Sequence, residues 1–348
     1  MSHLMILNYS MDERSPVLSH QIEVVRKLSV HFERVTVITG SIGHGGCPSN
    51  VEVVSTNWFS GKHLKNTFNF IITAIRCLRE SKPDVIFSHM THVQSALLLP
   101  ISRVLRIPHF LWYAHASSSI ILKWDYLLIN KIFTSTRGSF PFSGSKIIYL
   151  GQAIDEQLFL KSVRDRLPLN FVHYGRFDKS KSIEMIIESA NYARMSNPEI
   201  TLTICGNPSN PESERDASRI ILNSQEKIEA GWLSFINAIP RSEIPEWLSQ
   251  FDVFLHAFQG SLDKTLVESV LAGLTVVTNN LEFISEFGSW RNYSLDEDLS
   301  LKTELDAMLN LGRVTRTEVN ESRQKVALNS HTESKWIEQL KDILHAAI

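Results

Sequence analysis

The sequence predicts an α/β protein made of two successive Rossmann-like domains, and three observations support this prediction. Short apolar runs rich in β-branched residues alternate with segments whose apolar residues recur at helical spacing, which is typical of βαβ units. The alternation stops near residues 151–169 and then begins again. A length of 348 residues suits two ordinary domains. We therefore expect domains at 1–155 and 156–330 and a C-terminal helical segment at 331–348.

The first half contains seven expected strands, each an apolar run. They are Leu4–Asn8, Arg34–Thr39, Val51–Ser55, Asp84–Ser88, His109–Tyr113, Lys131–Ser135 and Lys146–Leu150. Helices are expected at His20–His31 and at Lys62–Arg79, where apolar residues recur every three or four positions. Because ligands of such sheets bind beyond the carboxyl ends of the strands, we expect a site in a cleft between two facing domains.

The second half repeats this pattern. Its expected strands are Asn170–Tyr174, Glu199–Cys205, Trp232–Ile236, Val253–His256 and Thr275–Thr278. A helix is expected at Ser182–Met195. In the last segment Trp336, Ile337, Leu340 and Leu344 form one helical face, which suits packing across the seam on the N-terminal domain.

Composition excludes several classes of protein. The chain is 43% hydrophobic and 21% charged, which is the balance of a globular protein and not of a disordered one. Cys47, Cys77 and Cys205 are far apart, which argues against a disulfide framework or a cysteine zinc site. The start MSHLMILNYS is typical of a buried strand and not of a signal peptide, and no run of about 18 apolar residues occurs. We expect a cytoplasmic protein.

The net charge of −2 conceals an asymmetry between the two halves. Residues 1–150 contain 15 Lys and Arg against 8 Asp and Glu, whereas the remainder contains 20 against 29, giving net charges of +7 and −9. Either these are scattered surface charges, or the first half faces something anionic, such as a membrane surface or a phosphorylated acceptor. We expect no nucleic-acid partner.

The first candidate site segment, GRFDKSKSIEMIIESA, follows an expected strand. It places Gly175 after the strand, and Arg176 and Lys181 before a helix. Two cations and the free N–H groups of a helix start suit a diphosphate, although a solvated basic turn is the alternative. The first strand of the chain lacks a following G-x-G-x-x-G, which argues against a nicotinamide dehydrogenase.

The second candidate segment is FQGSLDKTLVESVLAGLTVV. Its loop residues Gly260, Ser261 and Leu262 let backbone amides approach a phosphate. Glu268 lies on the following helix, where its carboxylate could accept hydrogen bonds from a ribose diol. The alternative for Glu268 is an ordinary carboxylate on a helix surface.

Together these segments resemble the donor domain of family 4 glycosyltransferases, which have the GT-B fold. The family pattern is Gly-Arg, then Lys-Gly, then two glutamates separated by seven residues and a helix ending Ala-x-Gly-x-Pro-Val. Gly175, Arg176 and Lys181 match the first part, and Glu268 matches the second glutamate. The resemblance implies that Arg176 and Lys181 bind the donor diphosphate and that Glu268 binds the ribose.

Three positions depart from the family pattern. Gly260 occupies the position of the first glutamate, Ser182 follows Lys181, and Leu274-Thr275 replaces the usual pair that ends in proline. The first departure bears on the donor sugar, because that glutamate normally contacts the sugar. The string GSLDK resembles a subgroup variant of this loop.

The N-terminal half resembles the same family, so that the resemblance covers nearly the whole chain. LWYAHASSSIILK, IFTSTRGSF and LGQAIDEQLF look like its Trp-Tyr-x-His, Thr-Ser-Thr and interdomain Gly-x-x-Ile-Asp blocks. The first block contains His115, and the resemblance implies that this histidine contacts the donor sugar near the reaction centre. A buried core histidine is the alternative.

Candidate residues on the acceptor side follow the carboxyl ends of two expected strands. In Met11–Gln21 they are Asp12, Arg14, Ser19 and His20, and in SHMTH the candidate is His89. One of them could accept the proton of the acceptor hydroxyl, or the donor phosphate could do so. Each also fits a structural role.

No metal or other cofactor is expected. Asp296, Glu297 and Asp298 precede an expected helix at Leu299–Leu311, where acidic residues stabilise a helix start. Arg176 and Lys181 can neutralise the diphosphate in place of a metal ion.

The sequence therefore predicts a retaining, metal-independent glycosyltransferase. It would transfer a sugar from a nucleotide-sugar donor to a glycan or lipid-linked acceptor, in cell-surface polysaccharide synthesis. Two alternatives stay open: a nucleotide-sugar 2-epimerase of the same fold, and a catalytically degenerate GT-B protein that binds a nucleotide sugar or a partner.

A membrane hypothesis rests on the expected helix Lys62–Arg79. One face would carry Leu64, Phe68, Ile71, Ile75 and Leu78, and an adjoining face Lys62, Lys65, Arg76 and Arg79. An apolar stripe bordered by cations suits a helix in an anionic membrane surface, and equally a helix that covers a sheet. The first case predicts a peripheral protein on the inner face of the cell membrane.

Overall fold

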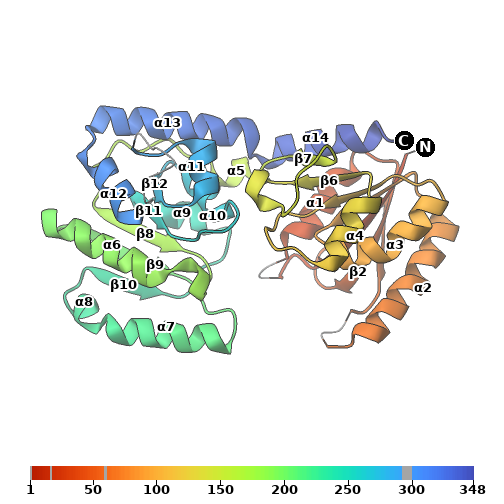
Figure 1. Ribbon diagram of the computed structural model, residues 1–348, viewed down its shortest axis with the longest axis horizontal. Coiled ribbons are helices and arrows are strands. Elements are labelled where there is room, and N and C mark those ends of the chain that lie inside the picture. Colours follow the sequence, from red (N-terminus) through yellow and green to blue (C-terminus); the bar gives the residue numbers. More distant parts are fainter. Residues whose placement is uncertain (1, 16–17, 59–60, 292–299) are drawn as a thin grey trace. The chain divides into compact units, whose positions relative to one another are not determined.

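The computed structural model describes residues 2–15, 18–58, 61–291 and 300–348, and Figure 1 shows its helices and strands. The chain divides into two compact units. The first unit comprises Met1–Gly151 with Lys335–Ile348, and the second comprises Gln152–Ser334. The C-terminal segment from Lys335 onward thus belongs to the unit that contains the N-terminus.

The first unit contains a parallel sheet of seven strands in the order β3-β2-β1-β4-β5-β6-β7. Its strands are β1 (His3–Met11), β2 (Arg34–Ile42), β3 (Val51–Ser55), β4 (Val85–His89), β5 (His109–Trp112), β6 (Lys131–Thr134) and β7 (Ile147–Tyr149). The strand order reverses direction between β1 and β4. At such a switch point the loops after the two strands diverge and leave room for a ligand.

Helices cover both faces of this sheet (Figure 1). On one face lie α2 (His63–Ser81), α3 (His92–Val104) and α4 (Ile120–Leu128), and the apolar side chains of α2 and α3 pack on Met5, Leu7 and Ile86. On the other face Trp336 of α14 (Glu333–His345) contacts Phe87 and Trp112. His345 of the same helix stacks on Phe32, which follows α1 (His20–Ser29).

The apolar stripe predicted for α2 is divided between two environments. The helix buries Asn66, Phe70, Ala74, Cys77 and Leu78. Leu78 from the predicted stripe is therefore part of the core, whereas Leu64 and Phe68 are exposed. The predicted stripe therefore borders the buried face, because α2 covers the sheet with a face rotated away from Leu64 and Phe68.

The second unit contains a parallel sheet of five strands in the order β10-β9-β8-β11-β12. Its strands are β8 (Asn170–Tyr174), β9 (Thr201–Cys205), β10 (Leu233–Ile236), β11 (Val253–His256) and β12 (Thr275–Thr278). Alternate side chains enter two separate cores: Phe171 and Val253 on one face, Val172 and Phe254 on the other. This is the period of two that a strand imposes.

The two faces of the second sheet carry different helices (Figure 1). One face is covered by α6 (Ile183–Ser196) and α12 (Leu301–Asn310), and the other by α10 (Lys264–Leu271) and α13 (Arg313–Ser330). The remaining helices of this unit are α5 (Glu156–Phe159), α7 (Pro211–Asn223), α8 (Gln225–Glu229), α9 (Ile244–Leu248) and α11 (Leu281–Phe287).

The prediction of an α/β protein with two parallel sheets is confirmed. Among the described helices, none combines the length and the apolar character needed to cross a membrane.

Candidate functional site

The two predicted donor segments follow neighbouring strands of the second sheet. β8 and β11 are hydrogen-bonded partners, and the strand order reverses between them. The segment that contains Gly175 to Lys181 leaves β8, and the segment that contains Gly260 to Leu262 leaves β11. Both segments therefore lie at the carboxyl edge of the sheet, at its switch point, where ligands of such folds bind.

Lys181 joins these two segments. It ends a short 3-10 turn, Lys179–Lys181, that leads into α6, and it is only 8% exposed. Its ammonium group donates a hydrogen bond to Asp263 and lies 4.3 Å from the centre of the Phe258 ring. The cation is therefore buried between a carboxylate and an aromatic face, both supplied by the segment after β11.

The Asp263 carboxylate interacts with three neighbouring groups. Its carboxylate accepts the Lys181 hydrogen bond, caps α10 through the Thr265 amide at 3.4 Å, and lies 3.4 Å from Nε2 of His256. Burial raises the pKa of Asp263, but the hydrogen bond from His256 and the charge of Lys181 outweigh burial and hold that pKa far below its usual value. Asp263 is therefore a carboxylate at neutral pH.

His256 completes this buried group as a neutral ring. Burial lowers its pKa, so the imidazole is uncharged at neutral pH. Its Nδ1 lies 3.0 Å from the hydroxyl of Thr278 on the next strand. The pairing with Asp263 then requires the proton on Nε2, so that the ring donates to the carboxylate.

Arg176 has a different setting from Lys181. Its side chain is 65% exposed, and its Nε lies 3.4 Å from a carboxylate oxygen of Asp178. An exposed ion pair of this kind contributes little to stability and leaves the guanidinium accessible. Of the two neighbouring cations in this segment, Lys181 is therefore buried and Arg176 is exposed.

Glu268 is buried, at 2% exposure, so it is not a surface carboxylate. It lies on α10, where Nη1 of Arg241 approaches its Oε1 to 2.6 Å and the Tyr174 hydroxyl donates to its Oε2 at 3.3 Å. Burial lowers the pKa of Arg241, but the Glu268 carboxylate outweighs burial, so the pKa is raised overall. Burial, and then the charge of Glu268, raise the pKa of Tyr174.

Phe258 explains why glycine occupies position 260. A Cβ atom on Gly260 would lie 2.1 Å from the Phe258 ring, so no side chain fits while the ring keeps its place. The amide of Asn280 donates to the carbonyl oxygens of Phe258 at 2.7 Å and Gly260 at 3.0 Å, which holds this loop. Ser261 is half-buried, and Leu262 is buried with its carbonyl bound by the Gln152 amide.

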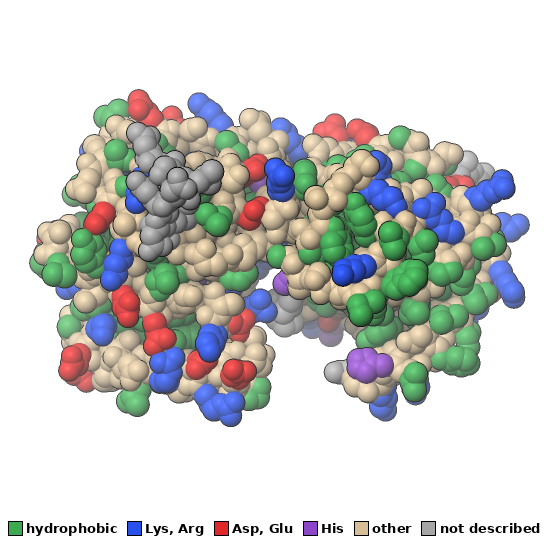
Figure 2. Space-filling view, in the orientation of Figure 1, with side chains coloured by type: hydrophobic (Ala, Val, Ile, Leu, Met, Phe, Trp, Pro, Cys, Tyr) green, Lys and Arg blue, Asp and Glu red, His purple; other side chains and the backbone are tan. Residues whose placement is uncertain are grey.

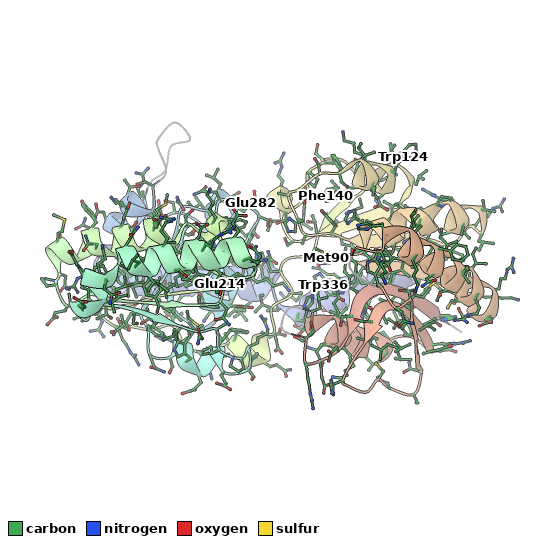
Figure 3. The ribbon with its side chains drawn as sticks, turned by 90° about the horizontal axis from the view of Figure 1, so that it is seen from below. Met90, Trp124, Phe140, Glu214, Glu282 and Trp336 are labelled. Atoms are coloured by element: carbon green, nitrogen blue, oxygen red, sulfur yellow. The ribbon has the colours of Figure 1, made fainter. Side chains whose placement is uncertain are left out.

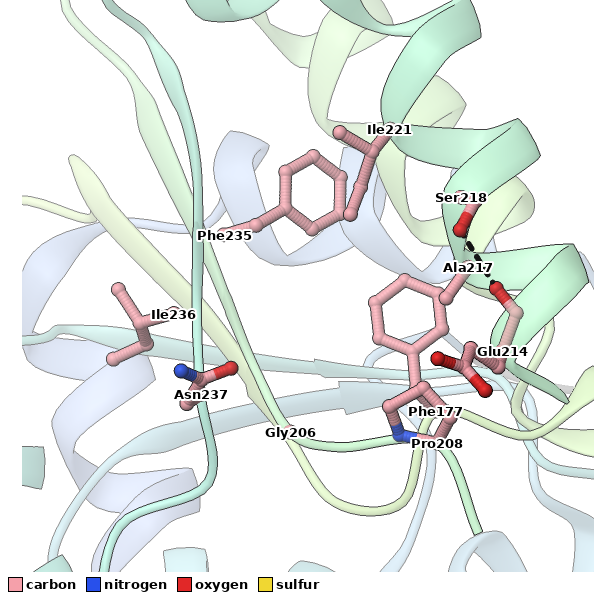
Figure 4. Close-up of a pocket in the computed structure, with 10 residues that line it drawn as sticks. All are labelled: Phe177, Gly206, Pro208, Glu214, Ala217, Ser218, Ile221, Phe235, Ile236 and Asn237. Atoms are coloured by element: carbon pink, nitrogen blue, oxygen red, sulfur yellow. Dashed lines mark hydrogen bonds between the residues drawn. The ribbon is translucent and has the colours of Figure 1, made fainter. Parts of the chain in front are cut away.

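A cavity of about 540 Å³ adjoins the segment after β8 (Figure 4). It is lined by two phenyl rings, Phe177 and Phe235, by polar side chains such as Glu214 and Asn237, and by residues of α7. The loops after β8 and β9 meet beside it, because a Cβ on Gly206 would lie 1.9 Å from the carbonyl oxygen of Gly175. The cavity offers both apolar faces and hydrogen-bonding groups.

His115 and the acceptor-side candidates all lie in the first unit. His115 is exposed just beyond β5, with its ring 6.4 Å from that of Tyr113, so it is not a core histidine. Asp12 accepts hydrogen bonds from the amides of Arg14 and His44, both at 3.0 Å, and these bonds lower the pKa of Asp12. Asp12 thus orders the turn after β1.

The remaining candidates follow β1 and β4 at the switch point of the first sheet. His20 and His89 lie edge to face with ring centres 5.6 Å apart. His89 is only 3% exposed and also contacts the rings of Phe87 and Trp336, so it belongs to an aromatic core cluster. Arg14 is exposed, and Ser19 is half-buried at the start of α1.

Across the described ranges, no group of three or more His, Cys, Asp or Glu side chains could hold a metal ion. The acidic run Asp296–Asp298 lies outside the described residues. Sequence reasoning missed Arg241, Asp263, His256 and Phe258. Asp263 precedes α10 as a capping aspartate, a pattern that reveals a helix start but no ligand site, and no family pattern marks the other three. Only their contacts with Lys181, Gly260 or Glu268 reveal these four residues.

Comparisons with known proteins give a family match within the second unit and similar folds for nearly the whole chain. Residues 168–292, which contain both donor segments, match the profile of the family described as Glycosyl transferases group 1. No curated protein matches the chain. Among solved structures, the chain is similar to Anabaena HepE in complex with UDP, with a TM-score of 0.74 and 14% identity over 99% of this chain and 100% of that one.

Two further structures have similar folds. The sucrose-phosphate synthase of Thermosynechococcus elongatus matches with a TM-score of 0.75 and 12% identity over 99% of each chain. The lipopolysaccharide outer core galactosyltransferase WaaB, in its apo form, matches with a TM-score of 0.71 and 11% identity over 99% of this chain and 100% of that one. The predicted GT-B fold with two Rossmann-like domains is confirmed, and the matching domain supports glycosyl transfer.

Proposed function

We propose that this protein is a retaining glycosyltransferase that moves a sugar from a nucleotide-sugar donor to a glycan or lipid-linked acceptor, in cell-surface polysaccharide synthesis. The observation that carries the proposal is Lys181, a buried cation that joins the segments after β8 and β11 within the glycosyltransferase-like domain. HepE, which has a similar fold, has been solved with UDP and with UDP-glucose, which supports a nucleotide-sugar donor.

The donor diphosphate would bind at the start of α6. Lys181 and Arg176 supply positive charge there, and the amides that open the helix point toward the same edge. Lys181 is already paired with Asp263, so the incoming diphosphate has to share or replace that carboxylate. Arg176 is free to turn from the exposed Asp178 pair toward the phosphate, because its side chain is largely exposed.

The nucleoside would lie between Glu268 and the cavity of Figure 4. The Glu268 carboxylate, oriented by Arg241 and Tyr174, can accept hydrogen bonds from the ribose hydroxyls. A planar base would stack against the phenyl rings of the cavity and bond to its amide groups. These assignments use side chains of the second unit only.

The reaction breaks the bond between the anomeric carbon and the diphosphate oxygen and forms a bond to the acceptor oxygen on the same face. The positive charges of Lys181 and Arg176 stabilise the negative charge that develops on the leaving diphosphate. The acceptor proton passes to a donor phosphate oxygen, so no protein base is needed. The two cations take the place of a metal ion at the leaving diphosphate. His115, exposed beyond β5, would contact the reacting sugar.

The test combines binding with product analysis. A panel of nucleotide sugars should include one that raises the melting temperature, since a ligand at a hundredfold excess over its Kd adds roughly 2.7 kcal/mol of stability. With that donor and a panel of glycan and lipid-linked acceptors, NMR of the product should show the anomeric configuration of the donor. An inverted anomeric centre would contradict the retaining mechanism, inversion at the second carbon would identify an epimerase, and binding without turnover would identify a binding protein.

A further inference from the structure

The helix α4 presents an apolar face that nothing in the first unit covers. Ile120, Trp124 and Leu127 recur at helical spacing and are 75%, 58% and 63% exposed. The opposite face of the helix, with Leu122, packs into the core beside Leu99 and Leu111. Figure 3 shows Trp124 at the outer edge of this helix.

Apolar surface continues on both sides of the helix. Between α3 and α4 lies a hollow of about 340 Å³. It is lined by Val93, Ala96, Leu97, Pro100, Ile121, Trp124 and Leu128. A second hollow of about 550 Å³ lies between α4 and the segment Pro141–Ser143. Val104 and Leu105, at the end of α3, are exposed as well. We call Val104, Leu105, Ile120, Ile121, Trp124 and Leu127 the α3–α4 patch.

The stretch of chain that carries this patch has accessible charges of one sign only. From Val85 to Ile154 the only acidic residue is Asp125. Its side chain is fully buried, and burial raises the pKa of Asp125 to about 8, so it is largely neutral at pH 7. The same stretch contains six cations: Arg103, Arg106, Lys123, Lys131, Arg137 and Lys146. Among the residues that the structure describes, none of the six has a carboxylate partner within salt-bridge distance.

Several of these cations border the patch directly. Nζ of Lys146 donates to the carbonyl oxygens of Tyr126 at 3.0 Å and Leu127 at 2.8 Å, and Nε of Arg103 donates to that of Leu128 at 2.5 Å. Both therefore lie at the C-terminal end of α4, and Lys123 lies on the helix itself. Figure 2 shows hydrophobic side chains gathered over α3 and α4 with Lys and Arg side chains among them.

We propose that the α3–α4 patch inserts into the surface of an anionic lipid bilayer. The apolar side chains would enter the boundary of the acyl chains, and Trp124 would lie at headgroup depth. Arg103, Lys123 and Lys146, which border the patch, would face lipid phosphates. This proposal deepens the proposed function by naming the surface that meets a membrane-borne acceptor. Ile120 is five residues beyond His115. The patch therefore begins soon after the histidine that we expect to contact the reacting sugar.

A second copy of the chain fits this patch poorly. An interface with twofold symmetry would bring together two sets of the cations that border the patch, and the stretch of chain that carries them supplies no accessible carboxylate to pair with them. A bilayer rich in anionic lipid supplies both the apolar layer and the negative charge.

The test is co-sedimentation with vesicles of phosphatidylcholine alone and of phosphatidylcholine mixed with phosphatidylglycerol. The full chain should bind the anionic vesicles, and added salt should weaken that binding. The variant I120S/W124S/L127S should bind at least about tenfold more weakly, because three apolar side chains no longer enter the bilayer. The matched control M195S/L222S/V314S removes three exposed apolar side chains of the second unit and should bind as the unchanged protein does.

Three outcomes would overturn the proposal: equal binding to neutral and anionic vesicles, unchanged binding of I120S/W124S/L127S, or loss of self-association in that variant without any change in vesicle binding. Vesicles of brominated lipid provide a second readout, because bromine quenches the fluorescence of a tryptophan that enters the bilayer. This quenching should be weaker in the variant Trp124→Phe. Nucleotide binding, measured without vesicles, should be the same in the patch variant and the control. The membrane surface and the transferase function can therefore fail separately.

Discussion

Lys181 and Arg176 are both cations of the candidate diphosphate site, yet their surroundings predict different effects of mutation. Lys181→Ala removes the cation that pairs with the largely buried Asp263 carboxylate, which should lower the free energy of unfolding by about 3–5 kcal/mol. Arg176→Ala removes only an exposed pair, so stability should stay within about 0.5 kcal/mol. Urea unfolding measures both effects.

Both variants should also bind a nucleoside diphosphate more weakly. Loss of one charge-assisted contact costs about 1.5–3 kcal/mol, which corresponds to a Kd roughly 10- to 150-fold higher. Calorimetric titration of the folded variants measures the change, with Lys179→Ala as a control at a neighbouring exposed lysine. Unchanged affinity in both variants would remove the diphosphate assignment.

Glu268 and Arg241 should act as one unit. Glu268→Gln removes the negative charge that both Arg241 and a ribose diol would use, so the KM for the donor should rise. Arg241→Ala should raise it as well, because the carboxylate loses its orientation. In the double variant R241A/E268Q the two effects should not add, with a coupling of about 0.5–3 kcal/mol in a double-mutant cycle. Fully additive effects would show that Arg241 does not act through Glu268.

At the scale of elements, Asp125 makes the packing of α4 on α3 sensitive to pH. Burial raises its pKa from 3.8 to about 8, so the folded protein holds a proton that the unfolded chain has lost between those values. Stability from this group is therefore complete below about pH 4 and is lost as pH rises toward 8. Asp125→Asn should lack this dependence and be more stable than the unchanged protein at pH 8 by a few kcal/mol.

Urea unfolding at pH 5 and pH 8 tests the prediction for Asp125. Glu80→Gln, at an exposed position on α2, is the matched control and should keep the pH dependence of the unchanged protein. An Asp125→Asn variant that loses as much stability between pH 5 and 8 as the unchanged protein would show that another group titrates.

At the scale of the whole molecule, the C-terminal segment completes the first unit although it follows the second unit in the chain. Trp336, Leu340 and Leu344 are buried, and Trp336 contacts Phe87 and Trp112 of the first sheet. A chain that stops after Ser334 should therefore lose stability in the first unit. A buried tryptophan alone accounts for about 3–5 kcal/mol, a large part of the stability of an ordinary domain.

Hydrogen exchange locates this effect. Amides of β4 to β6 should lose protection in the shortened chain, while those of β8, β11 and β12 keep it. The point variant Trp336→Ala should show a weaker form of the same pattern. Loss of protection confined to the second sheet would mean that the segment stabilises the other unit instead.

The sequence by itself determined the two parallel sheets and the switch from one to the other near residue 151, and it predicted the two donor segments. These features are local: strand and helix periods, and a glycine followed by cations or by a glutamate on a helix, are visible within about 20 residues of chain. The strands predicted from Leu4 to Thr278 are all present. The burial of Lys181 and Glu268 was not visible, because burial depends on what another element places beside a side chain.

Only the tertiary structure decided the partners at the site. Lys181 meets Asp263 across 82 positions, and Glu268 meets Arg241 from a loop that carries no signal of its own. The Phe258 ring fills the space that a side chain at position 260 would need. Packing against the sheet buries Leu78 of α2, whereas Trp124 of α4 stays exposed. The physical reason is the same in each case: helical periodicity shows that a helix has an apolar face, whereas the packing of distant segments decides whether that face is covered.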